Sequence, residues 1–92
     1  MELEYIDHED LGVTPEFVQA RISRLANDDT AYDELVAWWE KKKLPQGLQV
    51  VAMHGYPSLR LYVLDILQER GIEDKSDELI VDCALLVDNM IH

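Results

Sequence analysis

The sequence predicts an all-α fold, a small bundle of four to five helices that forms a single domain over residues 1–92. Three observations predict it. A chain of 92 residues fits one compact domain, and 48% of it is hydrophobic, enough to fill a core despite the high charge. Apolar residues recur at helical spacing through most of the chain. Short clusters of Gly, Pro, Asp and Ser separate these stretches, as expected of helix ends.

Residues 1–13 are predicted to be an N-terminal extended segment, either a short strand or a tail. Leu3 and Tyr5 alternate there with charged neighbours, and Gly12 ends the pattern. The helical bundle is then expected to occupy residues 14–91.

The first helix is predicted over residues 15–27. Thr14 suits the N-cap, Pro15 suits the first helical position, and Glu16 interacts favourably with the positive end of the helix dipole. The spacing of three apolar residues predicts one buried face: Val18, Ile22 and Leu25.

A second helix is predicted over residues 31–43, after the possible N-caps Asp28, Asp29 and Thr30. Trp38 points about 100° away from Trp39, so one of the two is expected to be partly exposed or to contact a different element. Lysines at 41–43 oppose the negative end of the dipole. The inner face of this helix is predicted to be Tyr32, Leu35, Val36 and Trp39.

Residues 48–54 form a short apolar run that is compatible with a strand or a helix, and we favour a helix. The next helix is predicted over residues 58–70, with Ser58 or Pro57 near its N-cap and Gly71 after its end. Apolar residues cover more than half of its circumference, so it is expected to lie at the centre of the bundle.

The last helix is predicted from residue 77 to residue 90 or 91, with Asp74 or Ser76 as its cap. It is also apolar nearly all round. Because a small monomer has difficulty covering two such helices, we expect a homodimer or another partner to bury part of them. The expected oligomerisation residues are Leu61, Leu64 and Leu85.

No catalytic, cofactor-binding or metal-binding residue is expected, and the protein is predicted not to be an enzyme. His8 stands among acidic neighbours that cannot converge on one ion in an extended chain, and His54 has no second ligand at metal-binding spacing. Cys83 falls on the apolar face of the last helix, where a core thiol is expected. The glycines are isolated, so no phosphate-binding loop is present.

The charge excludes two classes of ligand. The chain has 19 Asp and Glu against 8 Lys and Arg, giving a net charge of -11. Nucleic acid and anionic membranes would repel such a protein, so the expected partner is a basic protein surface. The absence of a signal-like N-terminus, of an apolar run long enough to cross a membrane and of a cysteine pair predicts a cytoplasmic location.

Many carboxylates lie at predicted helix starts and connectors, where dipole effects and solubility explain them without a function. The other interpretation is that they form the working surface. A dimer would carry 2 × 19 = 38 acidic groups, on the scale of a duplex of roughly 20 base pairs. The candidate partner-binding residues are Asp28, Asp29, Asp33, Glu34, Glu73, Asp74, Asp77 and Glu78.

Two resemblances point in the same direction. The segment YPSLRLYVLDIL at 56–67, followed by Gly71 and Ile72, resembles the central helix of the phage overcome-restriction proteins. That resemblance implies an acidic, helical, dimeric DNA mimic that blocks restriction enzymes. The order of TPEFVQ at 14–19, DELV at 33–36 and Tyr56-Pro57 is similar to that of the nuclease-colicin immunity proteins. This second resemblance implies a four-helix inhibitor that caps a basic nuclease.

The sequence therefore predicts a non-enzymatic acidic inhibitor of a nucleic-acid-handling enzyme, for example a phage or mobile-element counter-defence protein. The alternatives are a toxin-immunity protein and a helical adaptor that associates through the apolar faces of its last two helices.

Overall fold

The structure, a computed structural model, describes residues 6–45, 55 and 58–91. Across these ranges the chain forms helices and no strand, which confirms the all-α prediction. The predicted element at 48–54 lies outside the described residues. The five helices are α1 (His8–Leu11), α2 (Pro15–Asn27), α3 (Asp29–Lys41), α5 (Leu59–Glu69) and α6 (Asp77–Ile91).

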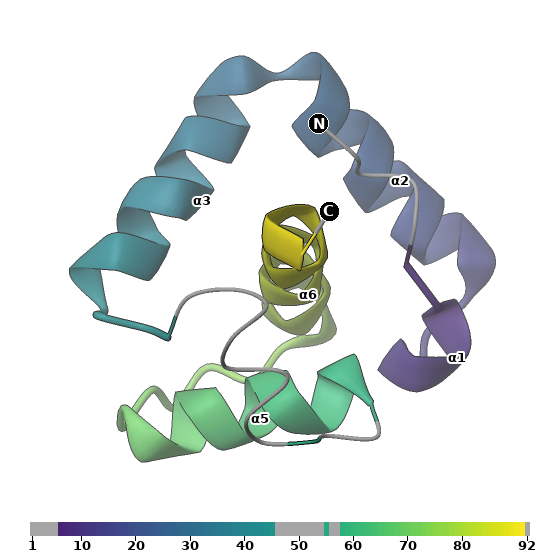
Figure 1. Ribbon diagram of the computed structural model, residues 1–92. Coiled ribbons are helices and arrows are strands. Elements are labelled where there is room, and N and C mark those ends of the chain that lie inside the picture. The colour runs from purple at the N-terminus through teal and green to yellow at the C-terminus, as the bar shows by residue number, and fades with distance from the viewer. Residues whose placement is uncertain (1–5, 46–54, 56–57, 92) are drawn as a thin grey trace.

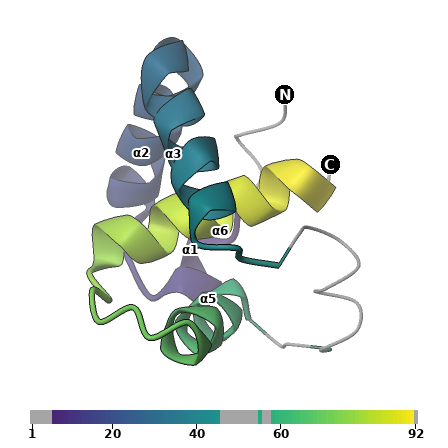
Figure 2. The ribbon, with the colours of Figure 1, turned by 90° about the vertical axis from the view of Figure 1, so that its left-hand side faces the viewer.

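Helix α6 lies at the centre of the fold (Figure 1). Helices α2 and α3 meet at a corner and pack on one side of α6, while α5 packs on the other side with α1 beside it. Figure 2 shows the same arrangement from the side on which α3 faces the viewer. The expectation that the helix at 58–70 is central was wrong, because α6 and not α5 contacts helices on both sides.

Side-chain caps explain where the helices begin. The Thr14 and Ser58 hydroxyls accept hydrogen bonds from the backbone N–H of residues three positions later, as predicted for α2 and α5. For α6 the cap is Ser76, whose hydroxyl accepts from the Leu79 N–H. Asp28 caps α3, so this helix begins at Asp29, two residues before the predicted start.

Three helices end with a similar arrangement of backbone hydrogen bonds. In each of them a residue with left-handed backbone conformation stands at the C-cap or directly after it. Gly12 after α1 and Gly71 after α5 adopt φ of 68° and 70°. After α3 the left-handed residue is Lys43, with φ of 55°. This turn ends α3 at Lys41 and not at the predicted residue 43, and it costs about 1 kcal/mol relative to glycine.

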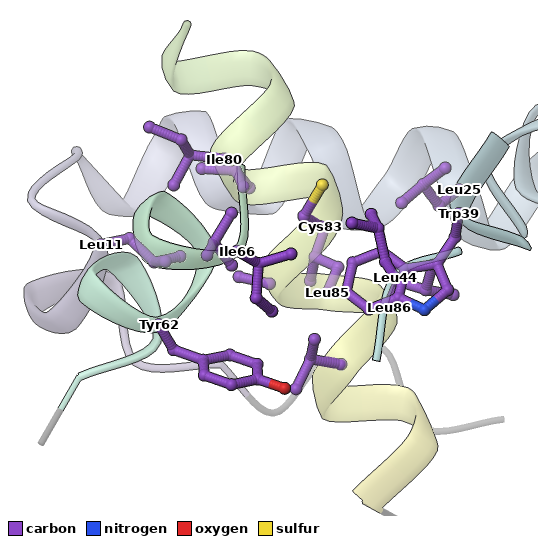
Figure 3. Close-up of a cluster of buried hydrophobic side chains, with 14 of the residues drawn as sticks. Leu11, Leu25, Trp39, Leu44, Tyr62, Ile66, Ile80, Cys83, Leu85 and Leu86 are labelled. Carbon is purple, nitrogen blue, oxygen red and sulfur yellow. The ribbon is translucent and has the colours of Figure 1, made fainter. Parts of the chain in front are cut away.

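The Lys43 turn also completes the core, because it brings the next residue back onto the helix. The Leu44 N–H donates to the Trp39 carbonyl oxygen at 3.2 Å. Both side chains are buried and lie next to each other in Figure 3. Trp38 is only half-buried, which agrees with the expectation that one tryptophan of the pair would be partly exposed.

The prediction of an extended segment over residues 1–13 was wrong for residues 8–11, which form the single helical turn α1. The Asp7 side chain accepts from the Glu9 N–H at 3.0 Å, and Gly12 ends the turn. Leu11 from this turn is fully buried against α5. A single helical turn is too short to be stable alone. The burial of Leu11 stabilises it, together with the Asp7 cap at its start and Gly12 at its end.

The core is built around α6, and it accounts for the apolar character of that helix within one chain. Seven apolar residues of α6 are buried, and Leu85 is 0% exposed. The prediction that Leu85 contacts a partner is therefore wrong, since Leu85 is buried within one chain, in a helix against which α2, α3 and α5 all pack. The buried apolar residues of α6 are Ile80, Val81, Cys83, Ala84, Leu85, Leu86 and Val87, and Asp88 is buried beside them.

Within the described residues, no helix is both long enough and apolar enough to cross a membrane.

Candidate functional site

The eight carboxylates predicted to bind a partner are all exposed, and they fall into two groups in space. We call Asp28, Asp29, Asp33 and Glu34 the acidic corner, because they lie where α2 meets α3. We call the second group, which lies on the α5–α6 connector and the first turn of α6, the connector acids: Glu73, Asp74, Asp77 and Glu78. Both views place the corner and the connector at separate parts of the molecule (Figures 1 and 2).

The acidic corner is positioned by a single linking residue. Asp28 is at once the C-cap of α2 and the N-cap of α3, with an extended backbone conformation. Its carboxylate accepts from the Ala31 N–H at 3.1 Å. Asp29, Asp33 and Glu34 follow within the first two turns of α3 and point outward. None of these four carboxylates has a Lys, Arg or His partner among the residues that the structure describes.

Two of the connector acids are paired with arginines inside the same molecule. Arg60 reaches from α5 to the Asp77 carboxylate at 3.2 Å, and the same guanidinium donates to the Leu11 carbonyl oxygen at 2.7 Å. Glu78 lies 3.9 Å from Arg21 of α2. Asp74 instead accepts from the Ser76 N–H in the connector. Asp77 and Glu78 thus take part in holding α1, α2, α5 and α6 together, whereas Glu73 and Asp74 join no two helices among the described residues.

The strongest ion pair joins Arg21 of α2 to Asp82 of α6. The Arg21 Nε donates to Asp82 at 2.9 Å and its second nitrogen contacts the other carboxylate oxygen, so the pair is bidentate. Both side chains are mostly buried, at 16% and 14% exposed. The hydrogen bond to Asp82 raises the pKa of Arg21, while partial burial opposes that rise. A charge pair of this kind holds α2 in one register against α6.

A second polar contact joins α3 to α6. The Asn89 side-chain amide donates to the Tyr32 hydroxyl at 2.6 Å. Burial raises the pKa of the Tyr32 hydroxyl above its ordinary value. The acidic corner is therefore held by contacts on both of its helices, through Arg21 on α2 and Tyr32 on α3.

No arrangement of side chains suited to catalysis is found in the part of the chain that the structure describes. Cys83 is fully buried, and burial together with the nearby Asp82 charge raises the pKa of its thiol to about 12, so it is not a nucleophile at neutral pH. No three His, Cys, Asp or Glu residues within the described ranges could hold one metal ion. His54 lies outside those ranges.

Of the three residues predicted to form an oligomerisation surface, one is exposed to solvent. Leu61 on α5 is 51% exposed and is the one large hydrophobic residue classed as exposed among those described. Leu64 is half-buried against the core. With Leu85 in the core, the three residues do not form a common surface, which weakens the adaptor interpretation.

Comparison of the chain with protein-family models, with curated proteins and with solved structures gives no match.

Sequence reasoning located the exposed carboxylates but missed their division into paired and unpaired groups. The Arg21–Asp82 pair joins residues 61 positions apart. One signal could have found it: Asp82 stands between apolar residues in the first half of the last helix, and an acid that becomes buried there requires a cationic partner. No comparable signal identified which arginine supplies it.

Proposed function

We propose that this protein is a non-enzymatic acidic inhibitor that binds a basic surface of a nucleic-acid-handling enzyme through its acidic corner. One observation supports this proposal most strongly. The four carboxylates of the acidic corner are exposed and have no cationic partner within the described part of the chain. A basic protein surface supplies the charge that the fold does not. The net charge of -11 favours approach to such a surface over long distances.

The density of charge at the corner is comparable to that of a nucleic-acid backbone. From Asp28 to Glu34 the chain carries four carboxylates over about 9 Å of helix axis. The same length of duplex carries about five phosphate charges. A cleft that binds duplex DNA therefore meets a similar charge when it meets this corner, and the two ligands would compete for it.

The corner is also rigid enough to present these charges without a large ordering cost. Three carboxylates stand on a helix, and both helices of the corner are fixed to α6 by the Arg21–Asp82 pair and the Tyr32–Asn89 contact. Binding of a preorganised surface loses less conformational entropy than binding of a flexible acidic tail. The resemblance to overcome-restriction proteins and that to colicin immunity proteins each support an inhibitor of this general kind.

The proposal is tested by inhibition of two enzymes that the resemblances suggest: a restriction enzyme and the nuclease domain of a colicin, each cleaving duplex DNA. We expect inhibition of one of them that weakens steeply as salt rises from about 0.1 M to 0.5 M, because the Debye length falls from about 10 Å to below 5 Å. The wild-type protein is compared with a corner variant, Asp28→Ser/Asp29→Asn/Asp33→Asn/Glu34→Gln, in which Ser keeps the cap.

A matched control removes the same number of charges elsewhere from exposed positions: Glu9→Gln/Glu16→Gln/Glu69→Gln/Glu73→Gln. If each corner charge contributes about 0.5 kcal/mol, the corner variant should inhibit about 30-fold less well than the wild type. The control should lose much less. Equal losses in the two variants would mean that net charge alone matters, and an unaffected corner variant would contradict the proposal.

A further inference from the structure

Arg60 connects the ends of three helices. It lies in the first turn of α5, and one nitrogen of its guanidinium donates to the carbonyl oxygen of Leu11, the last residue of α1, at 2.7 Å. Another nitrogen donates to the carboxylate of Asp77, the first residue of α6, at 3.2 Å. Because the last carbonyl groups of a helix have no partner within that helix, Arg60 supplies a hydrogen bond that α1 cannot make for itself.

The segment that Arg60 holds is short. Residues 6–13, which we call the α1 strap, consist of one helical turn and the residues on either side of it. Among the described helices, α1 packs chiefly against α5. Leu11 is the fully buried side chain of the strap, while Ile6 and Val13 are half-buried against the core. The strap is therefore held mainly by the burial of one leucine and by one hydrogen bond from a charged side chain.

The other four described helices are joined to each other without the strap. Helices α2, α3 and α5 each pack directly against α6, and α1 lies at the edge of this arrangement beside α5 (Figure 1). The Arg21–Asp82 pair and the Tyr32–Asn89 contact fix α2 and α3 to α6. A single helical turn is unstable by itself, so α1 is ordered only while it is docked. The remaining helices keep these contacts when the strap is undocked.

We propose that the α1 strap opens and closes on α5 separately, while α2, α3, α5 and α6 remain folded, and that Arg60, positioned by Asp77, controls this equilibrium. An element with few buried contacts belongs to the part of a fold that opens most easily. Gly12, with φ of 68°, and Val13 separate α1 from α2, which begins at Pro15. Rotation at these two residues moves α1 without moving α2.

Opening of the strap exposes apolar surface. In the closed state Leu11 belongs to the same buried cluster as Ile66 and Tyr62 of α5 (Figure 3). In the open state both the leucine and the part of the cluster that it covers are in contact with water, which is unfavourable. The closed state is therefore the ground state, and the strap is a reversible cover on one side of the core.

Asp77 acts on the strap through Arg60, so it is a positioning residue. Its carboxylate fixes the guanidinium in the place from which the bond to the Leu11 carbonyl is made. Without this carboxylate the long Arg60 side chain has more rotamers to lose when it binds α1. The two side chains are 32% and 56% exposed, so the effect of Asp77 is expected to be smaller than that of Arg60 itself.

Amide hydrogen exchange of the ¹⁵N-labelled wild-type protein, followed by NMR at several urea concentrations below the unfolding transition, tests the separate opening. The reporter is the Gly12 N–H, which donates to the His8 carbonyl oxygen at 3.0 Å. We expect its protection factor to be about a hundredfold lower than that of Leu85 in the middle of α6, and nearly independent of urea, because a small opening exposes little surface. Equal protection with equal urea dependence would overturn the proposal, and so would a Gly12 amide without protection.

Variants distinguish opening of the strap from unfolding of the whole chain. Arg60→Met should lower the protection of Gly12 and of Leu85 alike, about tenfold, because it destabilises the closed state from which both openings start. Tyr32→Phe removes the contact between α3 and α6, so it should lower the protection of Leu85 about fivefold and leave Gly12 unchanged. A Gly12 amide that is unaffected by Arg60→Met, or that responds to Tyr32→Phe as strongly as Leu85 does, would overturn the proposal.

The role of Asp77 is tested by a double-variant cycle on the Gly12 amide. Asp77→Asn should lower its protection about threefold in the wild-type background and should have no further effect in Arg60→Met. Glu78→Gln is the matched control, because it removes a charge from the same first turn of α6 without touching Arg60, and it should leave Gly12 unchanged. Equal effects of Asp77→Asn in the two backgrounds would show that Asp77 does not act through Arg60.

Discussion

The acidic corner and the first half of α6 both carry Asp and Glu side chains, yet they differ in whether a cationic side chain of the same molecule pairs with them. At the start of α6, Asp77, Glu78 and Asp82 meet Arg60 and Arg21 from other helices. At the corner, the described chain supplies only a backbone N–H to Asp28. The difference shows that the acidic residues of this protein stand in two kinds of surroundings. One set of carboxylates pairs with arginines from other helices, and the other set has no cationic partner within the described part of the chain.

The largest expected difference between the two regions is in stability. Arg21→Met keeps the apolar stem but leaves Asp82 mostly buried without its partner, which should lower the free energy of unfolding by about 2–4 kcal/mol. Arg24→Met, on the exposed side of the same helix, is the control and should change it by less than about 0.5 kcal/mol. Urea unfolding followed by circular dichroism measures both. Equal effects would remove the distinction between paired and unpaired charges.

The paired region also extends to Cys83, next to Asp82. The folded thiol has a pKa of about 12 against a reference value of 9.0, so between these values the unfolded state loses a proton that the folded state keeps. Stability from this group is complete below pH 9 and is lost as pH rises toward 12, by up to about 1.4 kcal/mol per pH unit. Urea unfolding at pH 8 and pH 10 should show a larger loss for the wild type than for Cys83→Ala. The same loss in both proteins would contradict this assignment.

Within the corner, one carboxylate is expected to matter for folding. Asp28→Ala removes the cap of α3 and should cost about 1 kcal/mol, whereas Asp28→Ser should cost little because its hydroxyl can accept the same bond. Thermal unfolding of the two variants provides the measurement. If Asp28→Ser were as damaging as Asp28→Ala, the charge of Asp28 and not its hydrogen bond would be what stabilises α3.

The smallest changes concern two exposed acids of α3 and the turn that follows this helix. Lys43→Gly should raise the free energy of unfolding by about 0.5–1 kcal/mol, because glycine adopts the left-handed conformation without steric cost. Asp33→Asn and Glu34→Gln should change it by no more than about 0.5 kcal/mol, since neither side chain contacts a described cation. Denaturant unfolding of the three variants checks both expectations. A destabilised Lys43→Gly would show that the lysine side chain contributes to the fold itself.

The sequence was sufficient for most of the local structure and for little of the packing. Thr14, Ser58 and Gly71 marked helix ends correctly because capping depends on residues close together in the chain. The position of α6 at the centre was not predicted, since two helices had similar apolar surfaces and only tertiary contacts decide between them. Residues 8–11 were missed for a related reason: one turn is stable only through the burial of Leu11.

For the candidate site, sequence reasoning correctly expected exposed carboxylates at helix starts but treated all eight as equivalent. Their division depends on Arg21 and Arg60, which lie far from Asp82 and Asp77 in the chain. Leu85 was assigned to a partner surface because the apolar circumference of its helix exceeds what a helix at the edge of a bundle can bury. In a central position the same pattern is satisfied within one chain.

The most direct test of the difference between the two acidic regions is a titration of the ¹⁵N-labelled protein with an oligo-arginine peptide, followed by amide chemical shifts at about 0.1 M salt. The peptide stands in for a basic protein surface. If the corner carboxylates are free and those at the start of α6 are occupied, the shifts should concentrate on residues 28–34 and leave residues 77–82 nearly unchanged. Shifts of equal size in the two segments, or larger ones at 77–82, would contradict the assignment of the acidic corner as the binding surface.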